Sequence, residues 1–276
     1  MSVVLPTRNR ADYLAVALSS VLAQETDDRF EVVVVDDGST DFTARVAERA
    51  GVRRIHHSSS RGLNAARNSG IAATTGPLIA FVDDDVRTPP GWLAALLAGT
   101  RELEWADAFG GPIRASLEGP APRSCGRESA PVTTLDLGPD NRETEFVWGA
   151  NLSVRRSAIE RVGGFDESLS GNGDEEEWLL RLREHRGRIA YVADAWLDHR
   201  RVGDDARLRA LARAEYRRGR AARVSNRRRQ IEPSLPHELR DLAGAGWHLA
   251  RRRCPQGAIM MAHSAGRLVE ALGARR

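Results

Sequence analysis

Two stretches decide the fold of this chain: EVVVVDD at residues 31–37 and PLIAFVDDD at residues 77–85. Each is a short apolar run that ends in adjacent aspartates. Runs without polar alternation are typical of strands that are buried on both faces of a parallel sheet. A segment with helical spacing of apolar residues follows each run, so strand and helix alternate along the chain.

The same alternation continues on both sides of these stretches. The first helix carries Leu14, Leu18, Val21 and Leu22 on one face. The other segments that extend the pattern are SVVLP at 2–6, TDFTARVAERA at 40–50, VRRIHH at 52–57, GLNAARNSGIAAT at 62–74 and PGWLAALLAG at 90–99. The order βαβα predicts an α/β fold with a mostly parallel sheet flanked by helices on both faces.

The second half of the chain changes character. Gly, Pro and Ser punctuate residues 110–141, which predicts a long irregular segment of the kind that often has a function. Strand-like runs at 146–156 and 188–197 then bracket a helix that begins in the acidic run 174–177. After His199 the pattern is helical to the end, so we expect a C-terminal helical extension with its boundary near Arg201.

Composition limits the alternatives. With 276 residues the chain is long enough for a substantial core. Cys125 and Cys254 lie far apart without a CxxC spacing, so we interpret them as incidental, with neither a disulfide framework nor a structural zinc site. No apolar run is long enough for a leader or a membrane span, which predicts a cytoplasmic protein.

The aspartates fall at the carboxyl ends of the predicted strands, where open α/β sheets bind their ligands. Asp36 and Asp37 end one strand, and Asp83, Asp84 and Asp85 end another. Carboxylates that are brought together in this way repel one another unless a cation or hydroxyl donors lie between them. A divalent metal and a ribose would meet that need. The alternative is that each cluster is a solvated loop that caps the next helix.

Two other nucleotide-binding folds are excluded by their phosphate-binding loops. A Rossmann dehydrogenase needs GxGxxG after its first strand, and a P-loop needs GxxxxGK followed by Ser or Thr. Here PTRNR follows the first strand, and the chain contains no lysine.

Six motifs in order resemble those of an inverting family 2 glycosyltransferase with a GT-A fold: VVLPTRNRADYL, EVVVVDDGSTD, RGLNAARNSG, FVDDD, GGFDE and GDEEEWLLRL. The resemblance covers the chain up to the helical tail. It implies a nucleotide-sugar-binding half at residues 1–100, an acceptor-binding half of the same domain at 101–201, and a helical extension at 202–276. It also implies transfer of a sugar from a nucleotide diphosphate, UDP by default, to an acceptor that the sequence does not identify.

The resemblance assigns roles on the nucleotide side. The nucleotide pocket would be lined by Pro6, Thr7 and Arg8. Asp36 would contact the base or the ribose, and Asp37 is the alternative residue for this contact.

Two arginines and the DXD element would complete the donor site. Arg61 and Arg67 would lie near the uracil or the diphosphate, or else are solvated arginines at a helix N-terminus. Asp83 would approach the ribose, Asp85 would bind Mn²⁺ or Mg²⁺, and Asp84 would be a supporting residue.

Three histidines are considered as metal ligands. His199 lies where related enzymes can place a third metal ligand, although a lone histidine is also often structural. His56 and His57 have no acidic neighbour in the sequence, so we interpret them as structural.

The acceptor side would be formed by the segment around Trp148, Gly149 and Asn151, with Trp148 either a platform for a sugar ring or a core residue. Counting back from the arginine of the last motif puts Glu175 at the position of the general base, and Asp174 takes the role if the GNG turn before it shifts the register. The acids can also simply favour the helix N-terminus.

The arginine-rich run at residues 207–229 has three interpretations: a solvated helix face, attraction to an anionic membrane or lipid phosphate acceptor, or, more weakly, nucleic acid. It matches no nucleic-acid-binding motif, so we expect that the chain does not bind nucleic acid. Peripheral contact at the inner membrane face is the expected alternative to a fully solvated run.

Two other function classes stay open: a catalytically silent nucleotide-sugar-binding scaffold and a sugar nucleotidyltransferase.

Overall fold

The computed structural model describes residues 1–126, 130–169, 174–228, 231 and 233–273. The chain divides into two compact units. The first contains Met1–Arg114 and Thr134–His199, and the second contains Ala115–Thr133 and Arg200–Arg276. The segment 115–133 thus groups with the C-terminal part, whereas residues 1–114 and 134–199 stay together.

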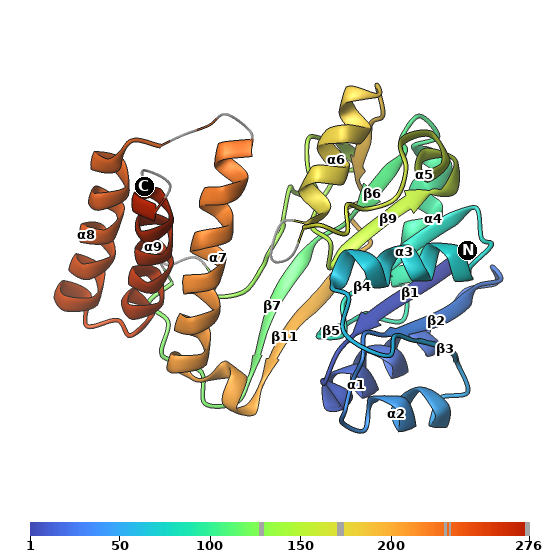
Figure 1. The fold of residues 1–276 in the computed structure, drawn as a ribbon, viewed down its shortest axis with the longest axis horizontal. Coiled ribbons are helices and arrows are strands. Elements are labelled where there is room, and N and C mark those ends of the chain that lie inside the picture. Colours follow the sequence, from blue (N-terminus) through green and yellow to red (C-terminus); the bar gives the residue numbers. More distant parts are fainter. Residues whose placement is uncertain (127–129, 170–173, 229–230, 232, 274–276) are drawn as a thin grey trace. The chain divides into compact units, whose positions relative to one another are not determined.

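The first unit is built on an eight-stranded sheet (Figure 1). Strands β8 and β9 run antiparallel to their neighbours, and the remaining pairs are parallel, so the predicted mostly parallel sheet is confirmed. In sheet order the strands are β3 (Arg53–His56), β2 (Glu31–Asp36), β1 (Ser2–Thr7), β4 (Leu78–Val82), β9 (Asn151–Arg155), β6 (Ala108–Gly110), β10 (Ile189–Tyr191) and β8 (Arg142–Thr144).

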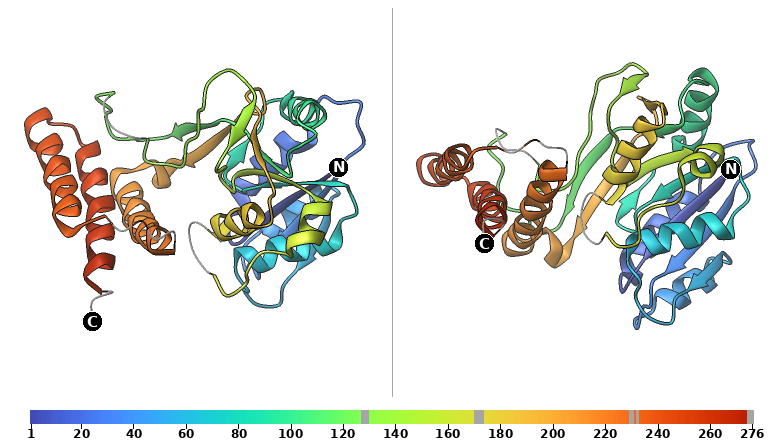
Figure 2. Two further views of the ribbon diagram at one scale, coloured as in Figure 1. Left: turned by 90° about the horizontal axis from the view of Figure 1, so that it is seen from above. Right: turned by 45° about the horizontal axis from the view of Figure 1, so that its top comes forward.

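Helices cover both faces of this sheet, as the uninterrupted apolar runs predicted (Figure 2). Successive strand residues point to opposite faces, so Val3 and Leu5 join one core while Val4 joins the other. Leu22, expected in the core, is 43% exposed. The first core is closed by α1 (Ala11–Leu22), α2 (Thr43–Arg49) and α4 (Trp92–Glu102), and the second by α3 (Leu63–Ala73), α5 (Arg156–Val162) and α6 (Asp174–Glu184).

A second sheet has the order β5 (Val86–Arg87), β11 (Leu197–Val202) and β7 (Ile113–Glu118). Strand β7 lies inside the segment 110–141 that was expected to be irregular, and Ile113 also forms a bridge with Leu135. The prediction of an unstructured loop was therefore wrong for this part. Residues 127–129 of the same segment lie outside the described residues.

The second unit contains the predicted helical extension. After a short 3-10 helix η1 (Gly203–Ala206) come α7 (Leu208–Arg228), α8 (Leu235–Arg252) and α9 (Gln256–Gly273), and α9 packs against both other helices (Figure 1). Two glycines allow α7 and α9 to approach closely. A Cβ on Gly219 would lie 2.1 Å from the His263 carbonyl oxygen, and one on Gly266 would lie 2.1 Å from the Tyr216 carbonyl oxygen.

Within the described part of the chain, no helix combines the length and the apolar character that crossing a bilayer requires.

Candidate active site

The aspartate clusters meet at one edge of the main sheet because the strands before them are parallel neighbours. Strand β1 lies between β2 and β4, and Thr7 at its end is in register with Asp36 at the end of β2. The residues that follow β4 begin at Asp83. The predicted convergence of the two clusters at this edge is therefore seen in the structure.

A network of polar contacts holds the DXD element in place. Thr7 Oγ1 donates a hydrogen bond of 2.8 Å to Asp84 Oδ2. Arg10 Nη1 lies 2.7 Å from Asp84 Oδ1 and 3.0 Å from Asp85 Oδ2, and both carboxylates are buried. Sequence reasoning assigned no role to Arg10. Its signal was its position between the end of β1 and the start of α1, at the same sheet edge as the aspartates.

Crowding at this edge raises the pKa of two carboxyls. Burial raises the pKa of Asp83, and the negative charge of Asp85 adds to the shift, while Arg67 and His199 oppose it. Burial likewise raises the pKa of Asp84 to about 7, although Arg10 opposes the shift. Carboxyls that resist ionisation in this way would be relieved by a nearby divalent cation, and oxygen donors are the ligands that Mn²⁺ and Mg²⁺ prefer. The residues at this edge therefore fit a divalent metal.

His199 lies beside the DXD element, although more than a hundred residues separate them in sequence. Strand β11 pairs with β5 so that His199 is in register with Val86, the residue after Asp85. As a result His199 Nε2 lies 3.3 Å from Asp85 Oδ1, and both side chains are buried. This placement supports the proposal that the imidazole is a metal ligand.

The segment around Trp148 lies next to the same aspartates. In the antiparallel pairing of β4 and β9, Val82 is in register with Asn151, so the residues that follow Val82 adjoin those that precede Asn151. The Asn151 side chain accepts a hydrogen bond from Trp92 Nε1 (3.1 Å) and donates one to the Ala195 carbonyl (2.8 Å). These two hydrogen bonds hold the segment around Asn151 against Trp92 and Ala195. Trp148 packs edge-on against Phe146, with 4.7 Å between ring centroids.

Glu175, Gly149 and Arg67 come together at this place. The backbone N–H of Gly149 donates a hydrogen bond of 3.0 Å to Glu175 Oε1. A Cβ on Gly149 would lie 2.4 Å from Arg67 Nη2 and 3.3 Å from Glu175 Oε2, so only glycine leaves room for both side chains. Glu175 is close enough to Asp83 to raise the pKa of that carboxyl. The predicted base and the predicted metal-binding element thus share one site.

Arg67 is not the solvated helix-terminal arginine of the alternative interpretation. It is 1% exposed, and its Nη1 donates to Asn64 Oδ1 at 3.2 Å. Its Nε has no hydrogen-bond partner among the described residues. A buried cation with spare hydrogen-bonding capacity beside Asp83 is suited to contact an anionic group of a ligand.

The GGFDE motif holds α6 against α3, a role that sequence reasoning did not foresee. Asn68 Nδ2 donates to the Phe165 carbonyl at 2.9 Å, and the Phe165 N–H donates to Asn68 Oδ1 at 2.9 Å. On the other side, Trp178 Nε1 donates to the Gly163 carbonyl at 2.8 Å. These contacts fix the distance between Arg67 on α3 and Glu175 on α6.

Of the two candidates for the base, the structure describes the side chain of Glu175 only. Glu175 is 7% exposed and has the contacts given above. The Asp174 side chain and the GNG turn at residues 171–173, on which the alternative register depends, lie outside what the structure describes.

The aspartates that end β2 are engaged by their own loop. Burial opposes ionisation of Asp37, but the backbone N–H of Arg61, the Ser60 hydroxyl, His57 and the N–H of Gly62 together hold its pKa below the usual value. His57 Nδ1 lies 2.7 Å from Asp37 Oδ1, so the histidine interpreted as structural does have an acidic partner.

The remaining predicted nucleotide contacts surround this loop. Asp36 is buried, accepts from the Ser39 N–H at 2.8 Å and lies 2.9 Å from Arg54 Nη1. His56 Nδ1 lies 3.5 Å from Asp36 Oδ2. The other three assigned side chains differ in exposure: Pro6 is buried, Arg8 is exposed, and the exposed Arg61 pairs with Glu167 at 3.0 Å.

The mixed sheet with carboxylates at its edge is an α/β arrangement of the GT-A type. The family model described as "Glycosyl transferase family 2" matches residues 2–163. The chain belongs to glycosyl transferase family 2.

Two curated relatives carry the names of glycosyltransferases. It is 34% identical over 212 residues to the pre-mycofactocin glycosyltransferase of Mycobacterium tuberculosis, covering 72% of this chain and 42% of that protein. It is 32% identical over 237 residues to the validoxylamine A glucosyltransferase of Streptomyces hygroscopicus, covering 71% of this chain and 54% of that protein. The chain thus spans about half the length of these relatives.

Solved structures show the same fold. The mannosyltransferase PcManGT from Pyrobaculum calidifontis, solved with GDP-Man and Mn²⁺, has a TM-score of 0.63 at 18% identity, covering 97% of this chain and 86% of that one. TarS 1–349 of S. aureus, solved with UDP-GlcNAc, has a TM-score of 0.57 at 20% identity, covering 78% of this chain and 64% of that one. The predicted GT-A fold is confirmed.

Proposed function

We propose that this family 2 chain is a metal-dependent glycosyltransferase that moves one sugar from a nucleotide diphosphate, UDP by default, onto an acceptor hydroxyl with inversion at the anomeric carbon. The observation that carries the proposal is the gathering of Asp83, Asp85, His199, Arg67 and Glu175 at one edge of the sheet. The relatives' sugar-transferring names and the ligands of the solved neighbours support it.

Asp85 and His199 would hold the divalent ion, Mn²⁺ or Mg²⁺, with Asp83 toward the ribose. When bound, the ion neutralises negative charge on the diphosphate. Arg10 and Thr7 position Asp84 and Asp85, so the carboxylates are already oriented before a ligand arrives. Arg67 supplies a buried positive charge to the anionic end of the donor.

Glu175 would act as the general base. The acceptor oxygen forms a bond to the anomeric carbon as its proton passes to the Glu175 carboxylate. The bond from that carbon to the diphosphate oxygen breaks on the opposite face, and its electron pair leaves with the nucleoside diphosphate. The hydrogen bond from Gly149 to Oε1 would keep the carboxylate oriented while Oε2 takes the proton.

The test is a thermal-shift panel of UDP-, dTDP- and GDP-sugars with and without Mn²⁺. A ligand at a hundred times its dissociation constant stabilises the folded state by about 2.7 kcal/mol. We expect the UDP-sugars to raise the melting temperature only with the metal, and Asp85→Asn to abolish that dependence and most turnover. Full turnover in excess EDTA would contradict the proposal.

The acceptor side of the proposal includes an anionic lipid surface. Several arginines of the run 207–229 pair within the second unit, with Arg220 and Arg227 on Glu270 and Arg223 near Glu238. Arg229 lies outside the described residues. Three exposed arginines of α7 recur every four residues, so they share one helix face: Arg209, Arg213 and Arg217.

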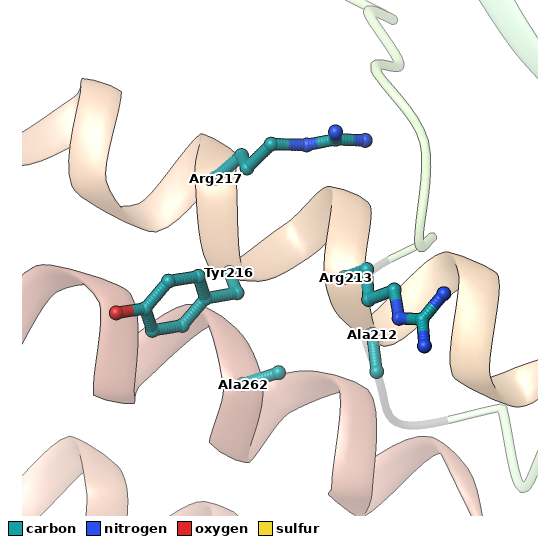
Figure 3. A pocket seen from close by; sticks show the side chains of 5 residues that line it. All are labelled: Ala212, Arg213, Tyr216, Arg217 and Ala262. Carbon is teal, nitrogen blue, oxygen red and sulfur yellow. The ribbon is translucent and has the colours of Figure 1, made fainter.

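Two members of this arginine face, which is defined as Arg209, Arg213 and Arg217, line a cavity of about 450 Å³: Arg213 and Arg217 (Figure 3). Figure 3 shows Arg213 and Arg217 extending in the same direction from successive turns, while Tyr216 lies toward the helix that carries Ala262. An apolar hollow next to aligned cations suits a lipid phosphate or an anionic headgroup. We therefore propose that the acceptor lies at a membrane surface or is linked to a lipid.

A further inference from the structure

The second unit brings together three metal-ligating side chains that the sequence keeps far apart. The ligand atoms of Cys125, His248 and Cys254 all lie within 4.8 Å of one another. Cys125 Sγ lies 3.4 Å from His248 Nε2. The interpretation of both cysteines as incidental, made because their spacing showed no zinc motif, therefore does not hold in three dimensions.

We propose that Cys125, His248 and Cys254 bind one zinc ion, at a site separate from the active site. Zinc takes thiolate and imidazole ligands at about 2.3 and 2.0–2.1 Å, in a tetrahedral arrangement. Two such ligands on one ion are then about 3.6 Å apart for sulfur and nitrogen, close to the observed distance between Cys125 and His248. On binding, each thiol releases its proton to solvent, and the two thiolates balance the charge of the ion.

The surrounding backbone presents these side chains from elements that the helices position. His248 lies on α8, and Cys254 follows the left-handed residue Arg253 that ends this helix. The Cys254 carbonyl accepts a hydrogen bond of 3.0 Å from the N–H of Gly257 at the start of α9. Cys254 is 3% and His248 is 6% exposed, so two of the ligands are fixed in the interior of the unit.

The third ligand comes from the segment 115–133, which already touches this corner. Cys254 Sγ contacts the Arg123 carbonyl at 3.8 Å, and Gln256 Nε2 donates to the Pro122 carbonyl at 3.4 Å. A zinc ion would add a bond from Cys125 to the same corner. It would thereby tie the segment between β7 and β8 to α8 and α9.

The site is open on one side. Cys125 is exposed and lines a cavity of about 440 Å³ together with Trp247, Arg251 and Arg252. The chain's described residues supply three ligands, and zinc with three protein ligands takes water at its fourth position.

A disulfide between the two cysteines is the competing explanation, and it leaves the histidine unexplained. A disulfide needs only the two sulfur atoms. It would not account for the distance of 3.4 Å between His248 Nε2 and Cys125 Sγ, which is close to the spacing of two ligands on one zinc ion. Sulfur and imidazole donors favour zinc, whereas the oxygen-rich active site favours Mn²⁺ or Mg²⁺. The sulfur ligands therefore favour zinc at this site.

The test is the metal content of the full chain, purified under reducing conditions, refilled with zinc and desalted. We expect about one zinc per chain. Cys125→Ser is the decisive variant because the residue is exposed and its replacement should not disturb the fold; it should lose at least tenfold in zinc affinity. His237→Gln is the matched control. His237 is an exposed histidine on α8, the helix that carries His248, and its variant should keep the metal.

Cobalt substitution gives a second readout. Wild type should show a sulfur-to-cobalt charge-transfer band that weakens in Cys125→Ser and Cys254→Ser and persists in His237→Gln. Asp85→Asn should keep both the zinc and the band, which separates this site from the proposed donor site. Wild type without zinc and without the band after refilling would overturn the proposal.

Discussion

Replacing Glu175 by glutamine isolates the proposed base from everything else that this side chain does. Glutamine has the same shape and keeps an oxygen that accepts the 3.0 Å hydrogen bond from the Gly149 N–H. It cannot take a proton. Loss of a general base lowers turnover by about 10² to 10⁴, which corresponds to about 3 to 5 kcal/mol in the activation free energy.

Donor binding should remain, since Arg67 and the aspartates that would contact the donor are unchanged. The assay follows release of the nucleoside diphosphate at saturating donor and, in parallel, the thermal shift produced by donor and Mn²⁺. Glu176→Gln, the neighbouring residue on α6, is the matched control and should turn over normally.

Three results would refute this reasoning. Near-normal turnover in Glu175→Gln, with a loss in Asp174→Asn, would transfer the role to Asp174. Near-normal turnover in both would remove this acidic run from the mechanism. Loss of donor binding and of folding stability in Glu175→Gln would show that the carboxylate mainly compensates the buried charge of Arg67.

Three further predictions follow from other contacts. Gly149→Ala should destabilise the fold by about 1–3 kcal/mol in urea unfolding, because the new Cβ would lie 2.4 Å from the buried Arg67 Nη2; an unchanged midpoint would contradict the packing argument. Because the folded-state pKa of Asp37 is lowered, its ionisation stabilises the fold above the unfolded-state pKa of about 3.9, and this stability is lost as pH falls through the folded-state value. The difference in unfolding free energy between wild type and Asp37→Asn should thus shrink below about pH 4, and a constant difference would refute the linkage. Changing Arg209, Arg213 and Arg217 to glutamine should abolish co-sedimentation with anionic vesicles at low salt, each arginine contributing about 1 kcal/mol; equal binding of wild type to neutral vesicles would show that the arginine face is only solvated.

The sequence predicted the sheet because the information for it is local. The composition of a run such as EVVVVDD predicts a buried strand with aspartates at its carboxyl end. Because neighbouring strands are parallel, Asp36 and Asp83 then lie at the same edge of the sheet. The same reasoning explains why Asp85 and its neighbours were found.

What escaped prediction depends on contacts between distant segments. Arg10 is one of many arginines in the chain, and its position after the first strand did not by itself reveal the 2.7 Å contact with Asp84. The role of Asn68 appears only once the GGFDE turn packs on α3. Cys125 and Cys254 are 129 residues apart, so no spacing rule could pair them with His248. These contacts arise from tertiary packing, which residue patterns do not encode locally.

Zinc in the purified chain could occupy either of the two proposed metal sites. Zinc binds most mixed nitrogen and oxygen sites more tightly than Mn²⁺ does, so Asp85 and His199 alone would not exclude it. A purified chain that contains zinc is therefore ambiguous until the ligands are separated by mutation. If Cys125→Ser removes the zinc while Mn²⁺-dependent donor binding persists, the sulfur site holds the zinc and the carboxylate edge is left for the harder ion. If instead Asp85→Asn removes the zinc, the ion was held at the carboxylate edge, and the sulfur site proposed for the second unit is refuted.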